Sequence, residues 1–298
     1  MSKFTIVGLG EVLWDVFPTH KQLGGAPTNF AYISGLLGDD GVVASRIGSD
    51  ALGHEVLTRL DELRLDASHI QHDPAHATGT VKVEVASDGQ PRFEITRAVA
   101  WDFLEWTPAL QALAARADAV CFGSLAQRGL QSRETIQKFI AATRQGAVRV
   151  FDVNLRQAFY SAEVLSKSAE SADILKLNHE EVPILVQAVG GPKVNELHSA
   201  QWLCRRFSLK LVCVTRGSSG SLLVTNAAYA EHAGYKVEVV DTVGSGDSFT
   251  ATLVHHYLRG SDLATINDAA NWMGAWVASK SGGTPAMEVE QIRRAQAS

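Results

Sequence analysis

A carboxylate follows two glycines in residues 241–249, which read DTVGSGDSF and are called here the C-terminal glycine segment. Valines dominate residues 236–240 before it and predict a strand, and apolar residues recur at helical spacing after Phe249. At the start of a helix, free backbone N–H groups and the helix dipole attract an anion such as a phosphate. Asp247 would lie in the first turn, where the dipole favours its charged form, and could accept a proton from a hydroxyl that attacks phosphorus. A tight turn with a capping aspartate is the alternative interpretation.

A second glycine turn occupies residues 23–29, which read LGGAPTN and are called here the N-terminal glycine loop. Pro27 suits the first turn of a helix, so the loop is expected to lead into one. The backbone of Gly25 and the amide of Asn29 could hold sugar hydroxyls there. An ordinary loop before a helix is the simpler interpretation of this segment.

Asn178 and Glu181 follow residues 174–177, an apolar run that predicts a strand. Asn178 can cap a helix whose first turn contains Glu181, and this needs no further function. An amide and a carboxylate at the carboxyl end of a strand could also help to hold hydrated Mg²⁺ and nucleotide phosphates.

Polar residues stand at the ends of two more predicted strands. They are Asp152, Asn154 and Arg156 after one strand, and Thr215, Gly217 and Gly220 after the other. The first three alternate, so they would share a direction in an extended chain, or form a buried polar network. The second three could approach phosphate oxygens or ribose, or form a hairpin turn.

Short apolar runs alternate with helical patterns along most of the chain. The runs lie at residues 4–7, 42–44, 119–122, 148–153, 174–177 and 211–214, and the helical patterns include 30–37, 52–63, 110–117 and 134–143. This alternation predicts a three-layer α/β/α domain with a mostly parallel central sheet.

Residues 81–85 and 92–96 interrupt this pattern, because apolar and polar side chains alternate there around the turn at residues 87–89. Strands that are polar on every second residue have one face away from the core. We expect a small sheet that stands off the main domain, joined by residues 12–17, and that could close over a ligand. An edge hairpin of the main sheet is the alternative.

Composition excludes several classes of function. A net charge of -5 over 298 residues, with no long run of lysine or arginine, argues against nucleic acid or a membrane as the main partner. Cys121, Cys204 and Cys213 are odd in number and predict free thiols in a reducing compartment. No apolar run reaches membrane-spanning length, so we expect a cytoplasmic protein.

These segments, in this order, resemble the PfkB or ribokinase family of carbohydrate kinases. The N-terminal glycine loop and the C-terminal glycine segment look like the two family signatures, and Asn178 to Glu181 looks like its N-x-x-E element. Thr215-x-Gly217 and Asp152-x-Asn154-x-Arg156 also match, so the resemblance spans nearly the whole chain. Residues 8–15, GLGEVLWD, and the sequence GGAP look most like fructokinases.

The resemblance implies a single ribokinase-like domain over residues 1–298, with a lid sheet from about residues 11–20 and 77–100. It implies transfer of the γ-phosphate of ATP to a primary hydroxyl of a small sugar, most of all fructose, and a homodimer formed through the lid sheets. Kinases for 2-keto-3-deoxygluconate, ribose or a nucleoside belong to the same family. A non-catalytic sugar-binding regulator would not need Asp247.

The resemblance also implies roles for individual residues. Asp247 would be the base, and the backbone amides of Gly244, Ser245 and Gly246 would form an anion hole. Sugar would bind to Asp15, Gly25, Asn29, Asn154 and Arg156. Nucleotide would bind to Asn178, Glu181, Thr215, Gly217, Gly220, Asn271 and Gly283, with Glu181 acting on Mg²⁺ indirectly. Asp241 and the carbonyl of Val243 match positions that often hold a monovalent cation such as K⁺. Ser245 departs from the family, in which alanine is commoner.

A dinucleotide-binding oxidoreductase is the main alternative class, because Gly8-Leu9-Gly10 follows a predicted strand. The third glycine of that fingerprint would fall at Leu13, and no P-loop sequence is present. Both common nucleotide-binding fingerprints therefore fail.

Overall fold

A computed structural model describes residues 3–85 and 91–297. Within these residues, nine strands form one large sheet in the order β13-β12-β11-β10-β9-β8-β1-β4-β5. The strands are β1 (Thr5–Leu9), β4 (Asp40–Gly48), β5 (Ile70–Asp73), β8 (Ala119–Gly123), β9 (Val148–Asp152), β10 (Ile174–Asn178), β11 (Leu211–Thr215), β12 (Ser221–Val224) and β13 (Tyr229–His232). Strands β11, β10, β9, β8, β1, β4 and β5 are parallel to one another. Strands β12 and β13 are antiparallel to their neighbours.

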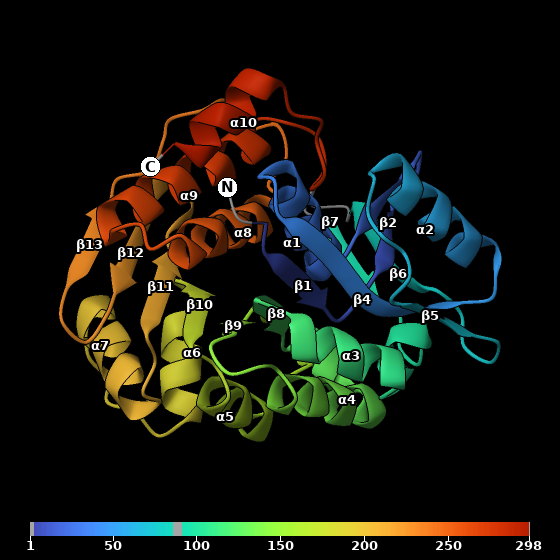
Figure 1. Ribbon diagram of the computed structural model, residues 1–298, viewed down its shortest axis with the longest axis horizontal. Helices are drawn as coiled ribbons and strands as arrows, with labels where there is room; N and C mark the ends of the chain where they lie inside the picture. The colour runs from blue at the N-terminus through green and yellow to red at the C-terminus, as the bar shows by residue number, and fades with distance from the viewer. Residues whose placement is uncertain (1–2, 86–90, 298) are drawn as a thin grey trace.

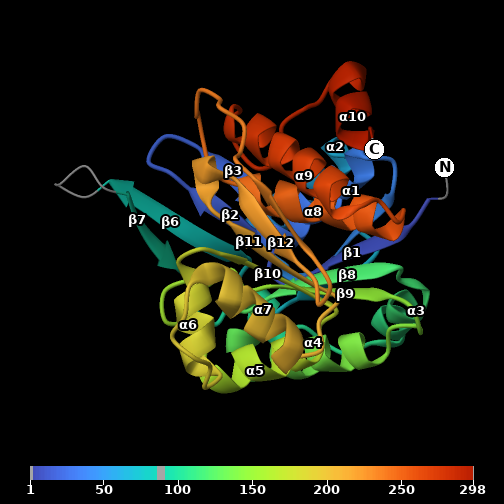
Figure 2. The ribbon, with the colours of Figure 1, turned by 90° about the vertical axis from the view of Figure 1, so that its left-hand side faces the viewer.

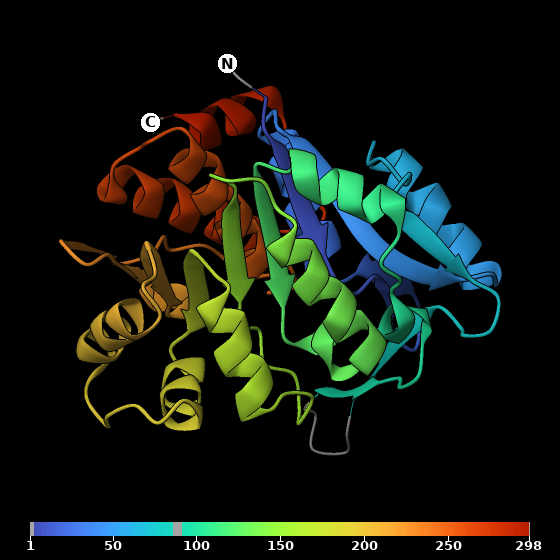
Figure 3. The ribbon, with the colours of Figure 1, turned by 60° about the horizontal axis from the view of Figure 1, so that its bottom comes forward.

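Helices cover both faces of this sheet, so the predicted three-layer architecture is confirmed (Figure 1). One face carries α1 (Ala26–Leu36), α2 (Ala51–Glu62), α8 (Ser245–Leu258), α9 (Leu263–Ala278) and α10 (Val289–Gln296). The other carries α3 (Pro108–Arg116), α4 (Leu130–Ala141), α5 (Ala162–Glu170), α6 (Glu181–Ala188) and α7 (Glu196–Arg206). Figure 2 shows the two helix layers above and below the sheet, and Figure 3 shows the second layer, green to yellow, in front. The central strands are apolar because both of their faces are buried.

A separate small sheet has the order β3-β2-β6-β7. Its strands are β3 (Lys21–Gly24), β2 (Leu13–Val16), β6 (Gly79–Val85) and β7 (Pro91–Ile95). β6 and β7 extend away from the main body in Figure 2, so the alternative of an edge hairpin on the main sheet is wrong. The turn expected at residues 87–89 lies outside the described residues. β3 was not expected, and it runs directly into Gly25 of the N-terminal glycine loop.

One local prediction is wrong. Residues 236–240 form no strand, and Val237, Val239 and Val240 are 41%, 57% and 63% exposed. Branched side chains favour a strand mainly when a neighbouring layer buries them, and no helix covers these three. Helix α9 ends at Ala278, with Ser279 as its C-cap.

The three cysteines are buried and free, as expected. Among the helices of residues 3–85 and 91–297, none combines the length and the apolar character needed to cross a bilayer.

Candidate active site

The N-termini of α1 and α8 meet through one hydrogen bond. Asn29, in the first turns of α1, donates from Nδ2 to Oδ2 of Asp247 at 2.8 Å. Asp247 lies in the first turn of α8, which begins after Gly244 in the left-handed conformation, at φ 76°. The fold therefore joins the N-terminal glycine loop to the C-terminal glycine segment, and the positive ends of two helix dipoles converge there.

Burial decides the proton affinity of Asp247. It raises the pKa of this carboxyl above its ordinary value, the hydrogen bond from Asn29 lowers it, and the charge of Asp152 raises it again. The net shift is upward. A raised pKa brings a carboxylate nearer to the pH at which a general base works best.

Close packing explains the glycines around Asp247. A Cβ at residue 244 would lie 2.4 Å from Cα of Gly283, and a Cβ at residue 283 would lie 2.6 Å from the amide of Asn29. Gly283, expected from the resemblance to serve the nucleotide, thus packs against Asn29, which bonds to Asp247. Ser245 directs its hydroxyl to the carbonyl of Gly274 in α9, at 2.9 Å, which explains how a serine fits at this position.

The amides of the proposed anion hole lie in the first turn of α8, where N–H groups lack intrahelical partners. The amide of Ser245 donates to the carbonyl of Thr242 at 3.2 Å, so it is partly engaged within the turn. A Cβ at Gly246 would lie 3.1 Å from Nζ of Lys176, so this lysine lies close behind the start of α8.

Lys176 is a functional candidate that the sequence analysis missed. It lies on β10 and is 7% exposed, and its Nζ donates to Asp152 at 3.1 and 3.0 Å. Burial alone would lower the pKa of Lys176, but the charges of Asp152 and Glu181 outweigh it and raise the pKa, so the ammonium stays charged. Thr250 donates to the second oxygen of Asp152 at 3.0 Å. A lysine inside an apolar strand was the available signal, since lysine is rarely buried without a partner.

Asp152 therefore belongs to a buried polar network, as one of the two interpretations predicted. The extended conformation in which Asn154 and Arg156 would share its direction does not persist. β9 ends at Asp152, Asn154 has φ 40°, and the chain then turns so that Arg156 is exposed. Asn154 still lines the cavity beside Asp247.

Asp15, on β2 of the small sheet, faces the N-terminal glycine loop. A Cβ at Gly24 would lie 2.4 Å from Oδ2 of Asp15. Burial raises the pKa of Asp15 to about 6, while the charge of Arg156 lowers it and that of Asp241 raises it. Arg156 also lowers the pKa of Asp247, so the charge of this exposed side chain favours the ionised forms of both Asp15 and Asp247.

The residues expected to serve the nucleotide lie at the carboxyl edge of neighbouring strands. Asn178 and Thr215 are direct partners in the β10–β11 ladder. Oδ1 of Asn178 accepts the N–H groups of Glu180 and Glu181 at 2.9 Å each, so its side chain bonds two N–H groups at the start of α6, whose N-cap position is Glu180. The carboxylate of Glu181 accepts the N–H groups of Leu155 at 2.7 Å and Asn178 at 2.8 Å.

This geometry fits an indirect role of Glu181 toward Mg²⁺, because backbone groups occupy both of its oxygens. Burial raises the pKa of Glu181, and the charge of Lys176 partly counters the shift. In the described part of the chain, no three histidine, cysteine, aspartate or glutamate residues group as metal ligands. Mg²⁺ in such sites is typically held by substrate phosphates, water and one or two carboxylates.

Gly217 and Gly220 form the turn between β11 and β12, so the hairpin interpretation is confirmed. Gly220 has φ 83° and packs against the backbone at His232. Asn271, which the resemblance assigns to nucleotide binding, is buried in α9. Its Nδ2 donates to the hydroxyl of Ser221 and to the carbonyl of Asn267, each at 2.7 Å. It holds α9 against β12.

Asp241 ties the C-terminal glycine segment to the loop after α9. Its carboxylate accepts the N–H groups of Val243 and Gly282, each at 3.0 Å. A carboxylate and nearby carbonyls are oxygen ligands, and each carboxylate oxygen has a second lone pair, so this donor set fits a monovalent cation.

Asp247, Asn154 and Thr250 line a cavity of about 10 Å³, and Asp152 and Glu11 complete its polar wall. A larger cavity of about 670 Å³, lined by Arg97, Arg128 and Phe159 among others, contains none of the residues discussed above. The chemistry is therefore concentrated at the junction of α1 and α8.

The family model for pfkB family carbohydrate kinases matches residues 6–290. Fructokinase-2 of Solanum lycopersicum is 30% identical over 313 residues, which cover 96% of this chain and 94% of the relative. The sugar kinase PH1459 of Pyrococcus horikoshii is 29% identical, with 93% of this chain and 91% of the relative covered.

Solved structures share the fold. The crystal structure of the uncharacterized sugar kinase PH1459 has a TM-score of 0.83 at 27% identity, covering 98% of this chain and 100% of that one. A fructokinase from Xylella fastidiosa has a TM-score of 0.86 at 21% identity, covering 99% and 98%. The family match spans nearly the whole chain, and this protein is a sugar kinase that belongs to the pfkB family of carbohydrate kinases.

Proposed function

We propose that this sugar kinase transfers the γ-phosphate of ATP to a primary hydroxyl of fructose. The observation that carries the proposal is the hydrogen bond between Asn29 and Asp247, because it places the expected sugar-binding loop beside the expected base. A structure of PH1459 at 27% identity is described as a complex with ATP, which supports ATP as the phosphate donor.

In this mechanism, Asp247 accepts the proton of the sugar hydroxyl as that oxygen attacks the γ-phosphorus. The first-turn amides and dipole of α8 stabilise the negative charge of the transferred group. Lys176 adds a buried positive charge behind Gly246. Glu181 would help to hold Mg²⁺ indirectly, and the bound ion would supply positive charge that neutralises the phosphates.

The small sheet supplies the remaining part of the proposal. β3 leads into Gly25, and Asp15 on β2 faces Gly24, so movement of this sheet would carry sugar-binding groups with it. We expect it to act as a lid that excludes water when sugar and ATP are bound.

The choice of fructose rests on GGAP and on the fructokinase relatives. It is tested by assaying fructose, ribose, 2-keto-3-deoxygluconate and a set of nucleosides with MgATP, measuring ADP release and the mass of the product. The Asp247→Asn variant, purified in the same way, controls for contaminating kinases. Fructose should have the highest kcat/KM, and much faster turnover of a nucleoside would show the fructokinase assignment to be wrong. Sugar binding without turnover would instead support a regulator.

A further inference from the structure

Glu11 is a buried carboxyl group that the mechanism above does not use. It lies between β1 and β2 and is 4% exposed. The backbone N–H of Ala26, at the start of α1, donates a hydrogen bond to its carboxylate. Within the described residues, Oε2 of Glu11 has no hydrogen-bond partner. One oxygen of this carboxyl is therefore free to exchange a proton.

The shared cavity places Glu11 and Asp247 on one small, partly open space. Its volume of about 10 Å³ is close to the space that one water molecule needs. Asn154 and Thr250 add polar groups to the wall, and a buried water typically makes two to four hydrogen bonds. A single water there would lie among the residues that carry both carboxyl groups.

We propose that Glu11 is the proton-relay partner of Asp247, receiving through this cavity the proton that Asp247 takes from the sugar hydroxyl. The inference rests on the proposed role of Asp247 as the base. In this role Glu11 acts through Asp247 and not on the sugar directly.

Atoms and charge balance in each step of the relay. The O–H bond of the sugar breaks and its proton goes to Asp247, while the new O–P bond forms and the bond to ADP breaks with its electron pair on ADP. A water molecule then accepts the proton from Asp247 and gives one of its own to Oε2 of Glu11. Asp247 is ionised again, and Glu11 returns its proton to solvent after product release.

The surroundings of Glu11 suit this task. The pKa of Glu11 is raised to about 7. Burial is the main cause and the charge of Asp247 adds to it, while backbone hydrogen bonds and the charge of Arg156 lower the pKa. A group with a pKa near the operating pH can both take up and release a proton.

The other titratable groups on the cavity do not compete for the proton. Lys176 and Thr250 occupy the oxygens of Asp152. Burial raises the pKa of Cys121 well above its ordinary value, so this thiol stays neutral near pH 7. Glu11 is thus the acceptor that remains on the cavity.

The test separates a relay from a purely structural bond to Ala26. Glu11→Gln keeps the shape and an oxygen for that N–H group, and Cys121→Ser changes the same cavity without removing the carboxyl. For the sugar turned over best, kcat of the wild type and of Cys121→Ser should fall as the pH decreases through about 7. In Glu11→Gln this limb should move to lower pH, and kcat on the alkaline side should fall roughly tenfold, less than the loss of the base itself would cause.

An unchanged midpoint in Glu11→Gln overturns the relay while leaving Asp247 as the base. Wild-type turnover by Asp247→Asn would overturn the proposed base and the relay with it. If Glu11→Gln does not fold, infrared spectra of wild-type enzyme with ¹³C-labelled glutamate give the second test. A buried glutamic acid band should titrate near neutral pH, and its absence would overturn the proposal.

Discussion

The side-chain amide of Asn29 donates a 2.8 Å hydrogen bond to Oδ2 of Asp247, joining residues 218 positions apart in the chain. The bond fixes the carboxylate at the point where the N-termini of α1 and α8 meet. It also lowers a pKa that burial would otherwise raise further. One contact thus fixes the position of the expected base and partly offsets the effect of burial on its pKa.

Gly244→Ala should lower both kcat and stability. Gly244 has φ 76°, and an added Cβ would lie 2.4 Å from Cα of Gly283, which itself packs against Asn29. The strained backbone alone costs about 1–3 kcal/mol. Gly260→Ala is the matched control, because Gly260 has φ 75° and no atom within 4 Å of the added Cβ. Steady-state kinetics should show normal kcat for Gly260→Ala, and an equal loss in both variants would rule out the contact with Gly283 as the cause.

Lys176→Met should destabilise the protein by roughly 3–5 kcal/mol, because it leaves Asp152 buried without its cation. Urea unfolding measures this change. The double variant Asp152→Asn with Lys176→Met should recover part of the loss, since neither partner then carries a buried charge. If Lys176→Met is as stable as the wild type, the pair does not hold β9 to β10.

The sequence predicted the large sheet well, because buried parallel strands appear as short apolar runs between helical patterns. The prediction of a strand at residues 236–240 was wrong, because the branched side chains there are exposed and no neighbouring layer buries them. The glycine segments and Asp247 could be found because their order along the chain resembles a family. Lys176 and Glu11 could not be assigned, because their partners are set by tertiary packing. β3 was missed because the sequence KQLG has no strand-like alternation.

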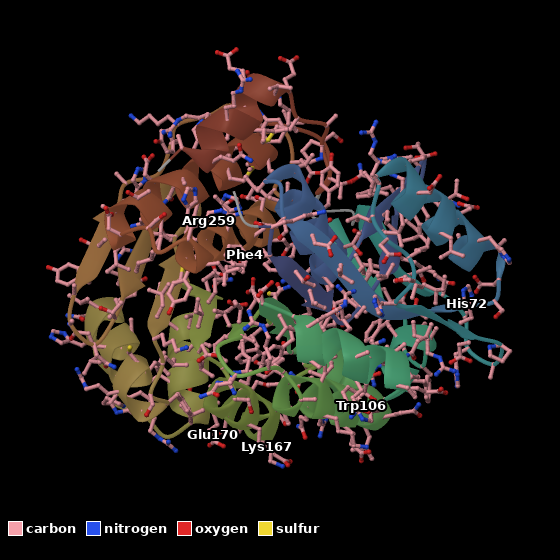
Figure 4. The ribbon with its side chains drawn as sticks, viewed as in Figure 1. Phe4, His72, Trp106, Lys167, Glu170 and Arg259 are labelled. Atoms are coloured by element: carbon pink, nitrogen blue, oxygen red, sulfur yellow. The ribbon has the colours of Figure 1, made fainter. Side chains whose placement is uncertain are left out.

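Asp39→Asn should reduce stability at neutral pH by about 3 kcal/mol, because it weakens a buried charge cluster. Asp39 accepts hydrogen bonds from His255 at 2.6 Å and Arg259 at 2.7 Å, and Arg259 lies over the ring of Phe4 at 5.0 Å (Figure 4). Burial alone would raise the pKa of Asp39, but these hydrogen bonds outweigh it and lower the pKa.

A lowered folded-state pKa means that the contribution of Asp39 is present above about pH 4 and is lost as the pH falls further. The stability difference between wild type and Asp39→Asn should therefore shrink in acid, as measured by urea unfolding across pH. Glu163→Gln is the control, because Glu163 pairs with Lys167 at the surface and should change nothing measurable. A difference that is independent of pH would contradict this account of Asp39.

Amide hydrogen exchange in residues 77–96 should slow when sugar and ATP are added together. Closure of the small sheet over the sugar would protect the β6–β7 ladder, which extends from the main body (Figure 2). α3 lies in the opposite layer and should exchange at the same rate with and without ligands. Equal exchange in residues 77–96 at saturating ligand would show that this sheet is not a lid.

The kcat of Asp247→Asn tests the central claim most directly. Asparagine keeps the shape and can still contact Asn29, so the free energy of unfolding and the affinity for nucleotide should change little. General-base catalysis contributes on the order of 10²- to 10⁴-fold, and the loss should appear in kcat. The account predicts a fall within that range, and a folded variant that keeps more than about a tenth of wild-type kcat would contradict the role of Asp247 as the base.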